Sequence, residues 1–336
     1  PLFDGQWYLD YLQIEELFEQ NMGNSSIKIA VIDSGIDIYH PDLQNKIIAP
    51  IDVVDADDDP SPRPGDYCFN GQVGICDTHG TAVAGIALAQ ADNDAGMVGV
   101  CPECSLVPIR MLGEGAPLSA DIAAFQHAFD QGVDVINNSW GYNVSMPVPT
   151  PLADVIQRVA SEGRNGKGTV IVFAAGNEDR EIQPDELCAM EEVLCISAID
   201  SYERPTQYTN YGSGIDLTAP SATVSIAPND QSTTNFGGTS AAAPIVSGLI
   251  GWLLSEDPTL SRAEVHNILI DTAIPSPLVS VDENGHHPFY GYGVISPKNL
   301  LDKLYPAEDP KPSGCRTVPL DFPLCTFIVL FLFRRR

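Results

Sequence analysis

The chain has 336 residues, of which 44% are hydrophobic, so it can bury a sizeable core in one large domain or two small ones. It carries 45 acidic and 17 basic side chains, which gives a formal net charge of −28 at pH 7. This charge argues against nucleic acid or an anionic membrane surface as a partner, and it suits secretion, high salt or calcium binding.

Short apolar segments alternate with longer amphipathic ones along most of the chain. The predicted strands are residues 28–32, 106–111, 133–137, 170–174 and 193–198. The predicted helices are residues 79–91, 120–130, 153–162, 239–254 and 262–272, and Ser261 with Glu264 forms a capping box before the last. Continuous apolar strands between helices predict an α/β fold with a mostly parallel central sheet and helices on both faces.

Three segments that are far apart in the chain place an aspartate, a histidine and a serine in settings suited to catalysis. Asp33 follows an apolar run, so it should end a buried strand, where functional side chains gather in parallel sheets. His79 and Ser240 each open a predicted helix. A hydroxyl becomes a nucleophile when a base takes its proton, and an imidazole needs a carboxylate to fix its tautomer. Each residue alone is typical of a turn, a structural histidine or an N-cap, but together they predict a triad.

The segments around these residues resemble those of the subtilisin-like serine proteases, or subtilases, which also have the order Asp…His…Ser. The resemblance covers about residues 1–306, and it looks closest to the kexin and furin branch or its bacterial relatives. It implies a three-layer subtilisin-like fold and peptide hydrolysis through a serine acyl-enzyme. The segments that carry it are Val31-Ile-Asp33-Ser-Gly-Ile-Asp37, Asp77-Thr-His79-Gly-Thr81, Gly238-Thr-Ser240-Ala-Ala-Ala-Pro244, the opening Pro1-Leu-Phe-Asp-Gly-Gln-Trp-Tyr-Leu9 and Ser139-Trp-Gly141.

The same resemblance implies an oxyanion donor and a substrate-binding strand. Ala174-Ala-Gly-Asn177 matches the oxyanion-hole segment, so the Asn177 amide and the Ser240 backbone N–H are the expected donors. Ser139, Trp140 and Gly141 match the strand that pairs with the substrate backbone, as in β-augmentation.

The sequence departs from furin-like enzymes where those enzymes bind basic side chains. Tyr142-Asn-Val-Ser-Met-Pro147 replaces an acidic cluster, and Ser34 stands where those enzymes carry a second aspartate. Asp185 and Glu186 are an alternative source of an acidic pocket floor. Cleavage after paired basic residues is therefore not predicted.

Calcium is expected as a structural cofactor, bound at two sites. Residues 52–59 contain five carboxylates, which repel one another unless a hard cation offsets their charge, although a solvated acidic loop is the alternative. The resemblance to a furin-like calcium loop implies three ligands there, Asp52, Asp57 and Asp59.

The resemblance implies a second calcium site between residues 40–43 and 90–97. Its side-chain ligands would be Asp42 and Asn93, and its carbonyl ligands would come from Gln90, Ala95 and Met97. One further ligand of the family would lie just before Pro1.

Eight cysteines fall at positions 68, 76, 101, 104, 188, 195, 315 and 325. The first six form three close pairs, for which local disulfides of a secreted protein are the simplest interpretation. A zinc site built from the first four is an alternative, although its spacing matches no standard ribbon. Cys101-Pro-Glu-Cys104 has redox spacing but lacks a thioredoxin-like pattern, so a structural clip is expected.

The chain ends suggest processing and targeting. The chain starts without Met or a signal peptide, so we expect that a signal and an N-terminal pro-segment have been removed upstream. Residues 307–321 read as a linker, and residues 322–336 form a short apolar stretch ending in three arginines. This tail resembles a bacterial sorting or anchoring signal. The expected location is therefore secreted, cell-surface or periplasmic, in a bacterium.

Two classes of function remain open from the sequence. The first is an active secreted serine endopeptidase, which acts on proteins or peptides and is either a processing convertase or a degradative protease. The second is a catalytically silent relative that binds peptides or calcium. The intact set of Asp33, His79, Ser240 and Asn177 favours the first class.

Overall fold

The computed structural model describes residues 5–63, 78–113, 116–117, 119–221, 224–277 and 279–306. Seven strands form a parallel sheet in the order β2-β3-β1-β4-β5-β6-β7. A short antiparallel pair, β8 (Ser225–Ala227) and β9 (Gln231–Thr233), lies apart from it. The strands of the main sheet are β1 Lys28–Asp33, β2 Ile51–Asp52, β3 Ser105–Arg110, β4 Val135–Asn138, β5 Val170–Ala174, β6 Val193–Ile199 and β7 Leu217–Pro220.

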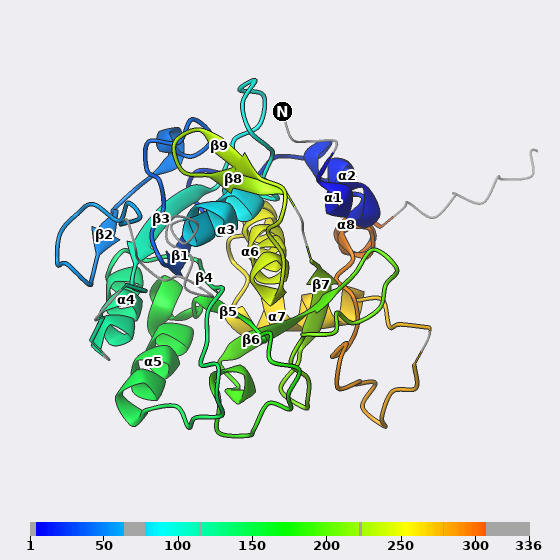
Figure 1. Cartoon of the computed structure of the whole chain (residues 1–336). Helices are drawn as coiled ribbons and strands as arrows, with labels where there is room; N and C mark the ends of the chain where they lie inside the picture. Colours follow the sequence, from blue (N-terminus) through cyan, green and yellow to red (C-terminus); the bar gives the residue numbers. More distant parts are fainter. Residues whose placement is uncertain are drawn as a thin grey trace, which may run out of the picture.

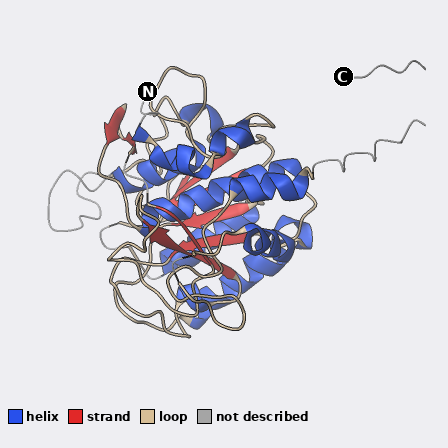
Figure 2. Cartoon of the chain, turned by 90° about the vertical axis from the view of Figure 1, so that its right-hand side faces the viewer, coloured by secondary structure: helices blue, strands red, loops and turns tan. Residues whose placement is uncertain are grey.

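Helices cover both faces of this sheet, as the sequence predicts (Figures 1 and 2). Alternate residues of β1 belong to two separate cores: Ile29 and Val31 pack with α3 and α6, whereas Ala30 and Ile32 pack with α4 and α5. Because successive side chains of a strand point to opposite faces, a strand that is apolar throughout must be covered on both sides. The covering helices are α3 His79–Leu88, α6 Thr239–Glu256, α4 Ser119–Asp130 and α5 Thr150–Gly166.

The other described helices lie at the border of the core that contains α6. The sequence predicts α7 (Arg262–Thr272) with its capping box, and the structure confirms both. Three helices were not predicted, because each has only five to eight residues: α1 Trp7–Leu12, α2 Ile14–Phe18 and α8 Pro297–Leu304. Their buried leucines nevertheless join the core beside α6.

The predicted element boundaries hold to within four residues. Helix α3 ends at Leu88 rather than residue 91, because the chain becomes extended at Ala89. Helix α5 begins at Thr150, directly after Pro149, and its regular part ends before Gly163, because the backbone of Gly163–Asn165 is not helical. Strand β4 begins at Val135, two residues later than predicted.

Two of the predicted disulfides are present. Cys101 is bonded to Cys104 and Cys188 to Cys195, whereas Cys68 and Cys76 lie outside the described residues. The zinc alternative is therefore wrong, because a disulfide leaves no thiolate on Cys101 or Cys104 to bind a metal.

The described part of the chain has no helix with both the length and the apolar character that crossing a membrane requires. The predicted linker, residues 307–321, and the predicted tail, residues 322–336, lie outside the described residues.

The strand order brings the predicted functional segments together. Strand β1 lies between β3 and β4, so the winding of the chain reverses there, and β5 follows β4 in the sheet. Ligand sites in open α/β sheets lie at the carboxyl ends of strands at such a reversal. Asp33 ends β1, Ser139 follows β4 and Asn177 comes shortly after β5, so these three side chains share one edge.

Candidate active site

Asp33 and His79 form a direct hydrogen-bonded pair. His79 Nδ1 lies 2.7 Å from Asp33 Oδ1, and the carboxylate is fully buried while the imidazole side chain keeps 25% of its surface exposed. The backbone N–H of Ser34 donates to the same carboxylate oxygen at 2.7 Å. The carboxylate therefore fixes the imidazole with Nδ1–H toward Asp33, which leaves Nε2 free to accept a proton.

Close packing of α3 against the end of β1 makes this pair possible. A Cβ atom at Gly80 would lie 2.3 Å from the carbonyl oxygen of Gly35 and 3.0 Å from Asp33 Cβ, so only glycine lets the first turn of α3 approach. The ring of Phe236 meets the His79 ring edge-on, with the ring centroids 5.3 Å apart. Phe236 was not predicted from the sequence as part of the site.

The surroundings of His79 change the pKa of its imidazole in opposite directions. Burial lowers the pKa because it disfavours the charged ring, but the charge of Asp33 and the hydrogen bond to it raise the pKa. The net result is a pKa above the usual 6.5. The imidazole is therefore a stronger base than an isolated histidine, and Asp33 supplies the difference.

Ser240 lies in the first turn of α6, in the same cavity as His79. Its hydroxyl donates to the carbonyl oxygen of Ser139 at 3.1 Å, and the hydroxyl of Ser139 donates back to the carbonyl oxygen of Ser240 at 3.0 Å. The hydroxyl of Ser240 thus bonds the residue that follows β4, and among the described residues no hydrogen bond joins it to His79. The structure places His79 and Ser240 at one cavity, and the buried Asp33 contacts His79, but only Asp33 and His79 are joined by a hydrogen bond.

Asn177 is oriented by Thr239, the residue before Ser240. The amide oxygen of Asn177 accepts from the Thr239 backbone N–H at 3.0 Å and from its hydroxyl at 3.1 Å. Thr239 Oγ1 accepts in turn from the backbone N–H of Gly176 at 3.1 Å, which defines which way the hydroxyl proton points. Because two donors of Thr239 hold the amide oxygen of Asn177, its NH₂ group must point away from Thr239. The sequence did not identify Thr239 as a positioning residue, since its role depends on a contact 62 residues away.

The cavity has a volume of about 640 Å³ and is lined by both His79 and Ser240. All three predicted substrate-binding residues, Ser139, Trp140 and Gly141, line it. Glu186 also lines it, whereas Asp185 is not among its lining residues. Of the two candidate acidic floor residues, the structure therefore places only Glu186 at the cavity.

The second predicted calcium site has features that fit a cation. Asp42 is fully buried and accepts from Asn93 Nδ2 at 2.7 Å and from the Met97 backbone N–H at 3.0 Å, and none of the ion pairs of the described residues includes it. No hydrogen bond among the described residues ends on the carbonyl oxygen of Gln90, Ala95 or Met97. A buried carboxylate outside any ion pair is costly, and one of the three unpaired carbonyls, that of Met97, belongs to a buried residue, so a hard cation suits this donor set.

Gln6 lies beside this loop and was not predicted. Its side-chain amide oxygen accepts from the Val98 backbone N–H at 3.1 Å, and its NH₂ group donates to the Val98 carbonyl oxygen at 2.7 Å. Gln6 is almost fully buried, so the segment before α1 is tied to the same loop as Asp42.

The first predicted calcium site is occupied by arginine side chains instead. Arg110 contacts Asp52, and Arg63 lies 3.2 Å from Asp57 and 3.8 Å from Asp59. Both guanidinium groups also reach Asp55. Within the described ranges, no three acidic, histidine or cysteine side chains are arranged to hold a metal ion. These residues therefore do not fit a calcium ion as they are folded here.

Comparison with known proteins gives a consistent result across sequence and structure. The sequence profile described as the Subtilase family matches residues 24–293. The chain is 30% identical over 376 aligned positions to the calcium-dependent protease of Nostoc sp., covering 96% of this chain and 54% of that protein. It is 33% identical to the halolysin-like extracellular serine protease Nep of Natrialba magadii, covering 85% of this chain and 50% of that protein. The chain thus spans about half the length of these relatives.

A solved structure supports the fold. The serine protease of Aeromonas sobria, determined in complex with its chaperone, superposes with a TM-score of 0.77 at 20% sequence identity. The alignment covers 90% of this chain and 66% of that protein. At this identity the likeness shows the fold alone.

Proposed function

Because the chain belongs to the subtilase family, we propose that it is a serine endopeptidase that hydrolyses peptide bonds through an acyl-enzyme on Ser240. The observation that carries the proposal is the 2.7 Å contact of Asp33 with His79 in a cavity that Ser240 and Asn177 also line. A module that only binds peptides has no need for a buried carboxylate that raises the basicity of a histidine.

The reaction begins when the Ser240 hydroxyl turns from Ser139 to His79. His79 Nε2 takes the hydroxyl proton while Ser240 Oγ attacks the scissile carbonyl carbon, and Asp33 stabilises the resulting imidazolium. The oxyanion receives hydrogen bonds from the NH₂ group of Asn177 and the backbone N–H of Ser240, aided by the start of α6. His79 then gives its proton to the leaving amine. In the second half of the reaction His79 takes a proton from water, which attacks the acyl group, and the proton then passes to Ser240 Oγ as the leaving group.

Calcium is proposed as a structural cofactor at the Asp42 site. Asp42 and Asn93 would supply side-chain contacts, and the carbonyls of Gln90, Ala95 and Met97 would complete the shell. The cation would offset the buried charge of Asp42 and hold the loop before β3 in place. The calcium dependence in the name of the Nostoc relative supports this proposal.

We further propose a secreted enzyme with a catalytic domain over residues 1–306, a linker over 307–321 and a sorting or anchoring tail over 322–336. The two disulfides fit an oxidising compartment, and the Natrialba relative is named extracellular. An N-terminal pro-segment is the expected folding partner, in line with the chaperone bound to the Aeromonas protease. The likeness to the kexin and furin branch rests on the sequence segments quoted above.

A serine-directed covalent probe tests the proposed activity. A fluorophosphonate should form a phosphorus–oxygen bond with Ser240 Oγ, release fluoride and pass the hydroxyl proton to His79. Mass spectrometry of a digest should locate the adduct on Ser240, and His79→Ala should lower the labelling rate by at least a hundredfold. A protein that reacts no faster than the His79→Ala variant is the silent binding module instead.

The pH dependence of hydrolysis should follow His79. Because Asp33 raises the pKa of His79 above 6.5, the neutral, active imidazole is lost as pH falls through a midpoint above that value. We expect kcat/KM to drop about tenfold per pH unit below the midpoint. The same raised pKa means that the Asp33–His79⁺ pair stabilises the fold below pH 6.5 and loses this contribution as pH rises through the midpoint.

An NMR titration of His79 in the Ser240→Ala variant measures this pKa directly, without autolysis. A titration midpoint below 6.5 would show that burial outweighs Asp33 and would contradict the assigned pair.

A further inference from the structure

The proposed oxyanion donor, Asn177, lies on an exposed loop. Asn177, Glu178 and Asp179 are all exposed, and none of them belongs to a helix or a strand. Gly176 and Asp179 adopt left-handed backbone angles, with φ of +99° and +50°. Such a loop keeps one conformation only when its surroundings fix it, whereas an oxyanion hole acts through donors that are in place before the charge develops.

Asn210 supports this loop from inside the protein. It has 1% of its surface exposed, and it is not among the residues that line the cavity. Its amide oxygen accepts from the backbone N–H groups of Glu178 and Arg180, each at 3.1 Å. Its NH₂ group donates to the carbonyl oxygen of Ala175 at 2.9 Å and to Glu178 Oε2 at 2.7 Å. These hydrogen bonds use the full capacity of a carboxamide, and only one orientation of the amide satisfies them all.

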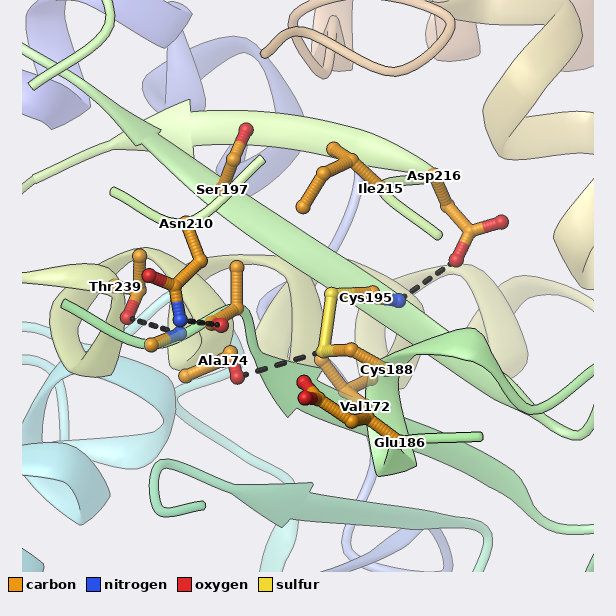
Figure 3. Close-up of a disulfide and its surroundings, with 12 residues drawn as sticks. Val172, Ala174, Glu186, Cys188, Cys195, Ser197, Asn210, Ile215, Asp216 and Thr239 are labelled. Atoms are coloured by element: carbon orange, nitrogen blue, oxygen red, sulfur yellow. Dashed lines mark hydrogen bonds between the residues drawn. A yellow bond between two sulfur atoms is a disulfide. The ribbon is translucent and has the colours of Figure 1, made fainter. Parts of the chain in front are cut away.

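The partners of Asn210 lie on both sides of Asn177 in the chain. Figure 3 shows the Asn210 side chain near the end of β5, where it binds Ala175, before Asn177. The backbone N–H of Asn210 also donates to the carbonyl oxygen of Gly176 at 3.0 Å. The N–H groups that Asn210 accepts come after Asn177. The loop is therefore held by one buried residue before and after the proposed donor.

The loop passes so close to Asn210 that a side chain does not fit between them. A Cβ atom at Gly176 would lie 2.3 Å from Asn210 Nδ2 and 2.7 Å from Glu178 Oε2. The close approach and the left-handed angle of Gly176 both require glycine at this position.

Glu178 links Asn210 to the backbone of Asn177. The same carboxylate oxygen, Oε2, accepts from Asn210 Nδ2 and from the backbone N–H of Asn177, the latter at 3.0 Å. Hydrogen bonds to a carboxylate are stronger than those between neutral groups. Thr239 thus orients the side chain of Asn177, while Asn210 and Glu178 hold its backbone.

We propose that Asn210 is a positioning residue of the oxyanion hole: it holds the loop on both sides of Asn177, so that the Asn177 NH₂ group is in place before the oxyanion forms. The inference rests on the proposed peptidase function. Because Asn210 does not line the cavity, its effect on the reaction passes through Asn177. Without its amide, backbone groups of the loop lose their buried partner, and the loop shifts to reach water instead.

Asn210→Ala is the first test. Initial rates on a chromogenic peptide amide should show a kcat lowered by about ten- to a hundredfold, because a misplaced donor stabilises the oxyanion poorly. KM should stay within about threefold, since the oxyanion exists only in the transition state and the intermediate beside it. An unchanged kcat, or a raised KM alone, overturns the proposal. If the wild type shows neither hydrolysis nor fluorophosphonate labelling, the proposed function itself has failed.

A double-mutant cycle with Asn177→Ala separates positioning from a general structural role. Once the Asn177 amide is gone, Asn210 has no donor left to position, so adding Asn210→Ala should lower kcat by less than about threefold more. If Asn210→Ala costs the same factor in both backgrounds, Asn210 acts elsewhere and the proposal is wrong.

Asn210→Asp keeps the test decisive if the alanine variant does not fold. Aspartate has nearly the same volume and still accepts from the N–H groups of Glu178 and Arg180. It offers no donor to Ala175, however, and its charge repels the carboxylate of Glu178. Folding is checked by thermal unfolding, and kcat should fall by about tenfold or more. A folded Asn210→Asp variant with wild-type kcat contradicts the proposal.

Asn21→Ala is the matched control, because Asn21 also holds two segments together through its amide. The amide accepts from the Gly23 backbone N–H at 2.6 Å and donates to Glu256, and Asn21 does not line the cavity. Its replacement should lower the unfolding temperature but leave kcat within about twofold. A fall in kcat as large as that of Asn210→Ala would assign the effect to general destabilisation and overturn the proposal.

Discussion

Replacing Ser240 by alanine is expected to lower kcat for peptide hydrolysis by about 10⁴-fold or more, because no other hydroxyl can form the acyl-enzyme. The fold should persist. Ser240 is half-buried, and its hydroxyl makes one hydrogen bond, to the carbonyl oxygen of Ser139, which is worth about 1 kcal/mol. Initial rates on a peptide substrate and a thermal unfolding curve measure the two effects separately.

Ser255→Ala is the matched control for this variant. Ser255 lies on the same helix, and its hydroxyl also donates to a backbone carbonyl, that of Gly251. The substitution removes a similar hydrogen bond but no proposed catalytic group, so activity should stay within about twofold. If Ser240→Ala keeps activity within tenfold of the wild type, the assignment of the nucleophile is wrong.

Chelation of calcium is expected to lower the unfolding temperature by several degrees. A ligand that binds only the folded state stabilises it by about 2.7 kcal/mol when its free concentration is a hundredfold above Kd. Asp42→Asn should abolish most of this dependence, because it removes the buried charge that the cation offsets. Thermal unfolding with and without EDTA, in the Ser240→Ala background, measures the effect without autolysis.

Asp94→Asn provides the matched control for the calcium experiment. Asp94 lies in the same loop as Asn93 but is exposed, so its substitution removes one negative charge without altering the contacts of Asp42. It should leave the response to EDTA nearly unchanged. An unfolding temperature of the wild type that does not respond to EDTA rules out calcium as a structural ligand.

In the acidic loop the folded chain offers a second source of positive charge besides the predicted calcium ion. Five carboxylates within residues 52–59 predict a cation, and the folded chain does supply positive charge there. Arg110 at the end of β3 and Arg63 contact these carboxylates directly. Because Arg110 follows Asp52 by 58 residues, only the pairing of β2 with β3 brings the two together.

The sequence by itself determined the sheet-and-helix pattern and where Asp33, His79 and Ser240 lie within it. An uninterrupted apolar strand, a capping box and a glycine before a helix are local signals, because each depends on about ten consecutive residues. That is why β5 and α7 agree with their predicted boundaries, and why His79 and Ser240 lie in the first turns of α3 and α6.

Tertiary structure alone decided how the side chains of the site act on one another. The packing of helices and loops around the sheet brings Asp33 to His79, Thr239 to Asn177 and Gln6 to the loop after α3. The ion pair of Arg180 with Glu186 depends on how the segment after β5 folds back to the disulfide with β6. Such contacts join residues that no local sequence pattern links. Their electrostatic effect depends on how deeply the groups are buried, which the amino-acid sequence does not reveal.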